Sequence, residues 1–288
     1  MSDHIEHSHI ETNGVTLHVA QAGPPDGDPI VLLHGFPEFW FGWSHQIPAL
    51  AAAGYRVIVP DQRGYNLSDK PKGLANYTLD KLAEDIIGLI DALGYEKVKL
   101  VVHDWGGAVG WWLVSMYPDR FEKFAALNIP HNSVFRRNLA KNAEQRKRSW
   151  YMFMFQIPLL PDLFFGKLGG FRLMIEKTSR RGVFSESELQ EYDKAWSQKG
   201  AARGMLAWYR ASFQKKSSSN PPREKVKVPT MIIWGVKDVA FLPDSVEQSA
   251  ALCEDVRVET FDHATHWVQH DEPDAVNKLL VEFFGETP

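Results

Sequence analysis

Hydrophobic residues fall into short continuous runs along this chain, and between the runs apolar positions recur every three or four residues. Short apolar runs bounded by turn residues are typical of strands that are covered on both faces, as in a parallel sheet. We expect such strands at residues 30–34, 56–61, 98–103, 123–128, 230–235 and 257–262. Near the N-terminus, two extended runs flank Asn13-Gly14, and this dipeptide predicts a β-hairpin.

The stretches between these runs have the spacing of amphipathic helices. In residues 78–94, "TLDKLAEDIIGLIDALG", Leu82, Ile86 and Leu89 fall on one helical face. Thr78 is placed to begin this helix and Gly94 to end it. Strands that alternate with helices predict an α/β fold, in which a mostly parallel central sheet has helices on both faces.

The alternation of strands and helices stops at residue 131 and resumes after residue 222. This segment has helical patterning, is rich in Trp, Phe, Tyr and Arg, and ends in "KKSSSNPP", a composition typical of a linker. We therefore predict three parts. Residues 1–130 form the first part of the core, residues 131–222 an inserted helical cap, and residues 223–288 the second part of the core.

The inserted segment contains two stretches of unusual composition. Residues 150–166, "WYMFMFQIPLLPDLFFG", are the most apolar in the chain, but Gln156, Pro158 and Asp162 interrupt them before they could cross a bilayer. We expect this stretch to line an apolar interior. Six basic residues lie between positions 136 and 148, and we interpret them as a solvated helix face.

Composition and charge exclude several classes of protein. With 44% hydrophobic and 24% charged residues among 288, the chain has the composition of a globular protein. The net charge of −4 gives no electrostatic reason to expect nucleic acid or a membrane as a partner. With Cys253 as the one cysteine, no internal disulfide can form, and the polar N-terminus lacks the features of a signal peptide. We therefore expect a cytoplasmic protein, and its oligomeric state is open.

The strongest chemical signal is "VKLVVHDWGGAVGWW", residues 98–112. It predicts a strand, a sharp turn and a helix, with Asp104 at the apex of the turn, where many hydrolases have a serine. Gly106 and Gly107 provide small residues where the strand and the helix come close. Aspartate is also a common helix cap, so this segment alone leaves a structural role for Asp104 open.

Other residues with suitable chemistry follow strands elsewhere in the chain. The stretch "HGFPEFW", residues 34–40, comes directly after a strand, at the position that supplies a backbone N–H to an oxyanion hole in one hydrolase fold. Asp238 follows the next-to-last predicted strand and His266 follows the last one. Nucleophile, acid and histidine in this order are the pattern of the α/β-hydrolase fold.

Three motifs extend this pattern to a family resemblance. The stretches "HGFPEFW", "DQRGYNLSDKP" and "HDWGG" resemble motifs of the epoxide hydrolases in the α/β-hydrolase superfamily, which has haloalkane and fluoroacetate dehalogenases as near relatives. The resemblance covers nearly the whole chain. It implies that Asp104 is the nucleophile, His266 the base and Asp238 the acid that orients the base. It also implies an oxyanion hole formed by the backbone N–H groups of Phe36 and Trp105.

A carboxylate at the apex of the turn predicts a particular reaction. Asp104 would attack a ring carbon of an epoxide and form an alkyl ester, which water activated by His266 can hydrolyse. A serine in the same place would form an ether, which water does not cleave readily. We therefore predict an epoxide hydrolase that converts an apolar epoxide and water to a vicinal diol, with no metal or other cofactor.

Opening of an epoxide leaves an alkoxide, which needs a proton or a strong hydrogen bond. Tyr151 and Tyr209 resemble the paired cap tyrosines of epoxide hydrolases, and a phenol is protonated at neutral pH and can donate. The resemblance also implies that the Phe36–Pro37 peptide bond is cis. In the "DQRG" turn, we expect Arg63 to form a structural ion pair.

Two alternative functions stay open. A dehalogenase uses the same aspartate, but haloalkane dehalogenases usually carry asparagine where this chain has Phe36, and fluoroacetate dehalogenases carry arginines after the nucleophile, where this chain has "WGGAVGWW". The second alternative is a protein that binds small molecules on this fold without turnover. Some roles also have rivals in the sequence, with His263 and His270 for the base and Asp244 and Asp262 for the acid.

Overall fold

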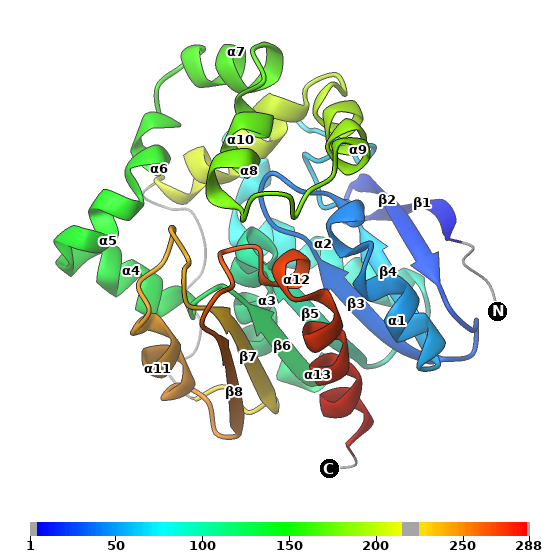
Figure 1. Cartoon of the computed structure of the whole chain (residues 1–288). Coiled ribbons are helices and arrows are strands. Elements are labelled where there is room, and N and C mark those ends of the chain that lie inside the picture. Colours follow the sequence, from blue (N-terminus) through cyan, green and yellow to red (C-terminus); the bar gives the residue numbers. More distant parts are fainter. Residues whose placement is uncertain (1–4, 215–224, 287–288) are drawn as a thin grey trace.

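In the computed structural model, which describes residues 5–214 and 225–286, an eight-stranded sheet runs through the middle of the molecule (Figure 1). The strands are β1 (Glu6–Thr12), β2 (Val15–Ala22), β3 (Asp28–Leu33), β4 (Tyr55–Pro60), β5 (Val98–His103), β6 (Phe121–Leu127), β7 (Thr230–Gly235) and β8 (Val256–Phe261). Their order across the sheet is β1-β2-β4-β3-β5-β6-β7-β8. The β1–β2 and β2–β4 pairs are antiparallel, whereas all pairs from β4 to β8 are parallel.

The predicted strands are confirmed, and each begins and ends within two residues of its expected bounds. The N-terminal hairpin is confirmed as well. Its turn residues Asn13 and Gly14 have φ angles of 43° and 73°, and two successive positive φ angles are the mark of the tight turn that this dipeptide favours. Short apolar runs predicted the strands well because β4, β5 and β7 are buried along their whole length.

Helices cover both faces of the sheet, as the alternating pattern predicted. Helices α1 (Gln46–Ala52) and α13 (Pro273–Gly285) pack on one face, and α2 (Leu79–Ala92) and α3 (Asp104–Met116) pack on the other. Each pair forms a separate apolar cluster with alternate residues of the strands. Two shorter helices, α11 (Ser245–Ala250) and α12 (Val268–Asp271), follow β7 and β8. The structure is thus a three-layer α/β fold.

The helix α2 has the predicted apolar face, and it also buries one charge. Leu82, Ile86 and Leu89 face the core, and Asp85 lies beside them with 1% of its surface exposed. The Arg63 guanidinium donates two hydrogen bonds to the Asp85 carboxylate and a third to the carbonyl of Asn76. The expected structural ion pair of Arg63 is therefore confirmed, and it connects the turn after β4 to the middle of α2.

A run of helices lies between β6 and β7 in the chain, on one side of the sheet (Figure 1). These are α4 (Asn132–Lys141), α5 (Ala143–Arg148), α6 (Trp150–Met154), α7 (Leu160–Lys167), α8 (Gly170–Thr178), α9 (Glu186–Trp196) and α10 (Ala201–Ser212). Helix α10 contacts the core closely, since Trp208 Nε1 donates to the carbonyl of Arg63 at 3.0 Å. The division of the chain at residues 130 and 222 stays a prediction, and its second boundary lies outside the described residues.

The expectation that residues 150–166 line an interior is wrong for about half of the stretch. Phe155 and Phe165 are buried, but Trp150, Leu159 and Leu160 are 63%, 80% and 67% exposed. The reason is that α6 and α7 are short helices on the outside of the molecule, so each can turn only one face inward. Separately, the described part of the chain has no helix with the length and apolar character that a membrane crossing requires.

Candidate active site

Asp104 stands at a sharp turn between β5 and α3, and its backbone is strained. Its φ angle of 47° lies in the left-handed region, which costs a residue other than glycine about 1–3 kcal/mol. His103 before it is still extended, and α3 begins at Asp104 itself. This turn places the Asp104 side chain at the carboxyl end of β5, where it lines a cavity.

Two glycines let the neighbouring loop approach this turn. A Cβ atom on Gly106 would lie 2.3 Å from the carbonyl oxygen of Leu33, and one on Gly35 would lie 2.6 Å from Cβ of Asp104. Any larger residue at either position would therefore separate the loop after β3 from the start of α3. The glycines in "HGFPEFW" and "HDWGG" thus allow the close contact that the site requires.

The loop after β3 points a backbone N–H group at the Asp104 carboxylate. Phe36 N donates to Asp104 Oδ1 at 2.8 Å, and the Phe36–Pro37 peptide bond is cis, as expected. Trp105 is the second residue of α3, so its backbone N–H has no carbonyl partner within the helix. Helix N-termini stabilise negative charge, and this end of α3 is directly at the carboxylate.

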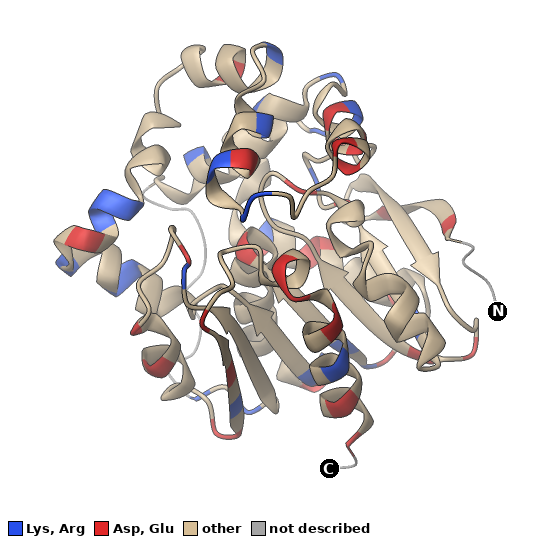
Figure 2. Cartoon of the chain, in the orientation of Figure 1, with Lys and Arg blue, Asp and Glu red and all other residues tan. Residues whose placement is uncertain are grey.

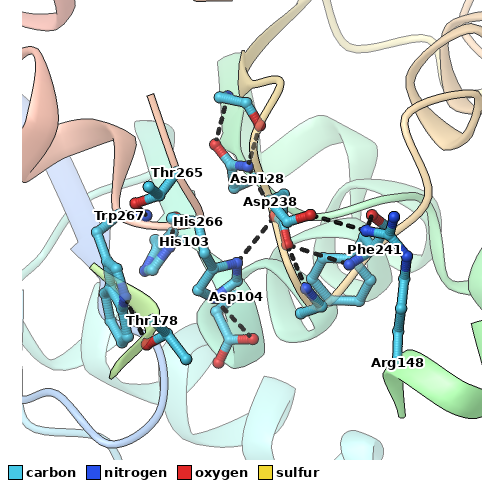
Figure 3. Close-up of polar contacts among 12 residues, drawn as sticks. His103, Asp104, Asn128, Arg148, Thr178, Asp238, Phe241, Thr265, His266 and Trp267 are labelled. Atoms are coloured by element: carbon cyan, nitrogen blue, oxygen red, sulfur yellow. Dashed lines mark hydrogen bonds and ion pairs between the residues drawn. The ribbon is translucent and has the colours of Figure 1, made fainter. Parts of the chain in front are cut away.

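His266 lies between the two carboxylates (Figure 3). Its Nδ1 is 2.9 Å from Asp238 Oδ2, and its Nε2 is 3.6 Å from Asp104 Oδ2. All three residues are buried, with at most 6% of their surface exposed. Sequence reasoning predicted Asp104, Asp238 and His266 from three distant segments, and the structure places all three side chains next to one another.

Asp238 is fixed by hydrogen bonds to both of its oxygens. Oδ1 accepts from the backbone N–H groups of Ala240 and Phe241 at 2.6 and 3.1 Å. Oδ2 accepts from Asn128 Nδ2 at 2.7 Å, in addition to its contact with His266. With its carboxylate held in this way, Asp238 can hold one orientation and one tautomer of the imidazole ring.

Charge strongly changes the acidity of His266. Burial lowers its pKa, but the nearby carboxylates of Asp238 and Asp104 outweigh burial and raise the pKa to about 10. Burial would also raise the pKa of Asp104, yet the bonds to His266 and Phe36 and the charge of His266 lower it below its usual value. At neutral pH, His266 and Asp104 therefore form an imidazolium–carboxylate pair.

Tyr151 of α6 and Tyr209 of α10 line a cavity of about 230 Å³ together with Asp104. The two rings meet edge to face with centroids 5.9 Å apart, and Tyr209 also contacts Trp105 at 5.0 Å. Burial and the charge of Asp104 raise the pKa of each tyrosine. Both phenols consequently stay protonated and can donate. Most of the other lining residues are apolar, among them Trp112, Ile129 and Phe241.

A third buried carboxylate is linked to the site through His103, and the sequence did not indicate its role. Glu38, within "HGFPEFW", is 1% exposed and contacts His103 Nδ1, His270 Nε2 and the Tyr192 hydroxyl at 3.1, 2.8 and 2.9 Å. Burial raises the pKa of Glu38, but hydrogen bonds from the two histidines hold it far below its usual value. His103 Nε2 in turn donates to the carbonyl of His266 at 2.8 Å, so this network supports the backbone of His266.

Arg148 is a further residue that sequence reasoning missed. Its Nη1 donates to the carbonyls of Asp238 and Phe241 at 2.8 and 3.0 Å, so it holds the loop that carries Asp238 (Figure 3). The interpretation of this arginine as part of a solvated face is therefore wrong. Arg148 also pairs with Glu144, four residues earlier on the same helix, at 3.3 Å. Because such i,i+4 pairs are common on exposed helix faces, the sequence pattern fitted a surface role for Arg148 equally well.

The rival residues lie elsewhere. His270 is occupied by Glu38, and His263 and Asp262 are exposed. Asp244 precedes α11 and accepts a hydrogen bond from Gln248 at 2.8 Å. Within residues 5–214 and 225–286, no group of three His, Cys, Asp or Glu side chains is arranged to hold a metal ion.

Comparison with known proteins agrees with this geometry. The family model described as alpha/beta hydrolase fold matches residues 28–273. The AB hydrolase superfamily protein YfhM of Bacillus subtilis is 42% identical over 283 residues, which cover 98% of each chain. Human epoxide hydrolase 4 is 34% identical, and the match covers 96% of this chain and 78% of the human protein.

Solved structures agree as well. The crystal structure of a Bacillus megaterium epoxide hydrolase in complex with an inhibitor superimposes with a TM-score of 0.88 at 35% identity, covering 97% of this chain and 100% of that one. The fold and the site thus define a hydrolase of the α/β class. The chain belongs to the α/β-hydrolase superfamily and, within it, to the epoxide hydrolase family.

Proposed function

We propose that this protein is an epoxide hydrolase that opens an apolar epoxide through an alkyl ester on Asp104 and releases a vicinal diol. The observation that carries the proposal is the carboxylate at the turn, with Oδ1 bound by the Phe36 N–H and Oδ2 facing His266. Support also comes from relatives that are named epoxide hydrolases and match nearly the whole chain. The inserted helices α4 to α10 act as the cap that supplies the tyrosines.

In the first step, Oδ2 of Asp104 attacks a ring carbon, and the C–O bond of the epoxide breaks. The electron pair of that bond goes to the epoxide oxygen, which takes a proton from Tyr151 or Tyr209. The carbon is now esterified to Asp104, and Oδ1 becomes the carbonyl oxygen of the ester. Because Oδ1 already accepts from Phe36 N, the oxyanion hole is in place before the second step.

The two steps are coupled by charge. In the free enzyme, His266 is protonated because the Asp104 carboxylate helps to raise its pKa. Esterification removes the negative charge of Asp104, so the pKa of His266 falls. Its proton can then pass to the tyrosinate that the first step leaves, which restores the phenol. The histidine therefore becomes a base when the ester is present, and not earlier.

In the second step, neutral His266 takes a proton from water, and the hydroxide attacks the ester carbon, Cγ of Asp104. The negative charge that develops on Oδ1 is bound by the N–H groups of Phe36 and Trp105. The bond from Cγ to Oδ2 then breaks, and the leaving alkoxide takes the proton of the hydroxyl group that water brought to Cγ. The diol leaves with Oδ2, and Asp104 is again a carboxylate that keeps the oxygen from water. Asp238 stabilises the imidazolium that forms in this step.

Substitution of the histidine tests the proposal directly. His266→Gln removes the base but leaves Asp104 free to attack, so the ester should accumulate. We expect intact-protein mass spectrometry to find one substrate mass added after incubation with a panel of aryl and alkyl epoxides. His263→Gln, at an exposed histidine three residues away, is the control and should turn over epoxide without an adduct.

Other outcomes would contradict the proposal. Halide release from haloalkanes, with no diol from any epoxide, would assign the same carboxylate to a dehalogenase. Binding heat from epoxides with neither adduct nor diol, while circular dichroism shows an intact fold, would indicate a binding protein without turnover.

A further inference from the structure

Large apolar side chains are exposed close together in the chain, on α6, α7 and the turns next to them. We call this set the apolar patch, and its members are Trp150, Phe153, Ile157, Leu159, Leu160, Leu163, Phe164 and Leu168. Each is at least 39% exposed, and Leu159 reaches 80%. Single exposed apolar residues are normal on a protein surface, but eight of them between residues 150 and 168 indicate a site of interaction.

The helical spacing of the patch separates exposed from buried residues. On α7, Leu160, Leu163 and Phe164 are exposed at i, i+3 and i+4, while Pro161 and Phe165 are buried. The apolar face of α7 therefore points out of the molecule in addition to the face that points in. Burial against the core does not account for the outward residues.

Basic residues adjoin the apolar patch in the chain, on α4 and α5. We call Arg136, Arg137, Lys141, Arg146 and Lys147 the basic patch. Within the described ranges 5–214 and 225–286, none of the five forms an ion pair with a carboxylate. Blue bands gather on α4 and α5 in Figure 2, and the neighbouring α6 is tan.

The charge of this region is opposite to that of the whole chain. Residues 136–173 contain eight Lys or Arg and two Asp or Glu, a net charge of +6, whereas the chain carries −4. The remainder of the protein is therefore strongly acidic. Such a separation of charge orients a molecule near a charged surface, with the positive side toward negative charge.

The two patches also adjoin the mouth of the candidate active site. Phe153 of the apolar patch stacks edge to face on Phe213 at 5.4 Å, and Phe213 lines the cavity that contains Asp104. Arg136 of the basic patch lines the same cavity. A surface that covers the patches would consequently lie next to the opening of the cavity.

We propose that the apolar and basic patches dock together on an anionic lipid surface. Helices that lie in a bilayer interface combine Trp, Phe and Leu on one face with Lys and Arg beside them. Trp150 is the first residue of α6, between the basic and the apolar residues, and tryptophan prefers the boundary between headgroups and acyl chains. Helices α6 and α7 have five and eight residues, so they insert shallowly and do not span the bilayer.

A second copy of the chain is the other conceivable occupant, and charge disfavours it. A symmetric dimer through this face would place the same patch on both partners. Two basic patches, each unpaired with carboxylates within the described residues, would then be brought together and repel one another. Phosphate headgroups carry the opposite charge and match the patch without such repulsion.

Vesicle sedimentation tests the proposal on the unliganded protein. We expect the protein to sediment with vesicles of phosphatidylcholine and phosphatidylglycerol at low ionic strength, and at least about a hundredfold less with phosphatidylcholine alone. Added salt should reduce the binding, since it screens exposed charges. No epoxide is used, so the result does not depend on the proposed function.

Substitutions in the apolar patch test whether it contributes to vesicle binding. Leu159→Glu with Leu160→Glu places two charges on the two most exposed apolar residues and should abolish sedimentation. Leu67→Glu is the matched control, because Leu67 is 48% exposed but lies outside the inserted helices. Thermal melting followed by circular dichroism checks that each variant remains folded.

A second pair of substitutions tests whether the basic patch contributes to vesicle binding. Lys141→Gln with Lys147→Gln should weaken binding to anionic vesicles about tenfold. Lys97→Gln with Lys278→Gln removes the same charge from exposed sites elsewhere and should have little effect.

Three results would overturn the proposal. They are equal binding to neutral and anionic vesicles, unchanged binding by both patch variants, and no vesicle binding at all. In the last case, a dimer that light scattering detects and the Leu159→Glu, Leu160→Glu variant dissociates would identify a second copy as the occupant.

Discussion

At the scale of single residues, we propose that the pairing of Asp104 with His266 determines when each can act. Their side chains are 3.6 Å apart, and each charge stabilises the other. A base that were already neutral in the free enzyme could activate water before any ester exists. In the proposed mechanism the pair prevents this, because His266 stays protonated until Asp104 loses its charge.

The charge coupling predicts a change in the pKa of His266. Because the carboxylates raise its pKa to about 10, the wild-type imidazole should stay protonated through neutral pH and titrate only in alkaline solution. Asp104→Asn imitates the neutral ester, so the pKa should fall by about 1–3 units. Titration of isotopically labelled histidine by NMR, with His266→Gln to assign the signal, measures both values. An unchanged pKa in Asp104→Asn would refute the coupling.

The tyrosines make a separate prediction about the leaving oxygen. Tyr151→Phe with Tyr209→Phe removes both phenol donors but leaves the rings, and diol formation should fall by about 10²–10⁴-fold in kcat/KM. Either single variant should retain more activity, because the other phenol can still donate. Tyr117→Phe, at a half-exposed tyrosine outside the cavity, is the control. A double variant with wild-type activity would remove the tyrosines from the mechanism.

The sequence predicted those site residues that follow a strand in a recognisable pattern, and it missed those whose roles depend on distant contacts. Asp104, Asp238 and His266 each follow a strand, so their approach to one another could be expected from the order of the chain. Glu38 lies within "HGFPEFW", but its contact with His103 and the contact of Arg148 with Asp238 each span more than 60 residues, so the local pattern did not indicate them. Their positions follow from tertiary packing, which a single sequence does not reveal.

At the scale of elements, buried polar contacts hold helices and loops in place relative to the central sheet. The Arg63–Asp85 pair connects the turn after β4 to α2, and both side chains are 2% exposed. Arg148 connects α5 to the loop after β7. Both contacts join elements that are distant in the sequence.

Loss of one partner of the Arg63–Asp85 pair should be strongly destabilising. Burial raises the pKa of Asp85, so the Arg63 bonds keep a carboxylate that would otherwise resist ionisation in the core. Arg63→Met should therefore reduce the free energy of unfolding by about 3–5 kcal/mol, whereas Arg63→Met with Asp85→Leu should recover most of it. Urea unfolding measures both. The exposed Lys81–Glu84 pair on the same helix is the comparison, and Lys81→Met should cost about 0–1 kcal/mol.

Substitution of Arg148 should reduce activity more than it reduces the stability of the fold. Arg148→Met frees the carbonyls of Asp238 and Phe241, so the loop loses a contact that positions the acid. We expect kcat to fall about tenfold, since small displacements of catalytic groups are costly. Arg146→Met is the control, since it removes the same charge from the same helix. Arg146 donates to the carbonyl of Ala140 and not to the loop that carries Asp238. Equal activity of both variants would contradict a positioning role for Arg148.

At the scale of the whole molecule, the sequence predicted the fold better than the surface. Apolar runs and helical spacing are local signals, and they predicted the parallel sheet, its hairpin and its covering helices. The net charge of −4 concealed a region of +6, because a sum over the chain contains no positions in space. The exposure of Leu159 and Leu160 was missed for a similar reason, since apolar composition alone does not separate an inner from an outer face.

In the catalytic cycle that we propose, water attacks the carboxyl carbon of Asp104 and not the substrate. A single turnover with excess enzyme in water labelled with heavy oxygen tests it most directly, with the diol and the Asp104 peptide analysed by mass spectrometry. We expect an unlabelled diol and one heavy oxygen in the carboxyl group of Asp104. A labelled diol with no label in Asp104 would contradict it.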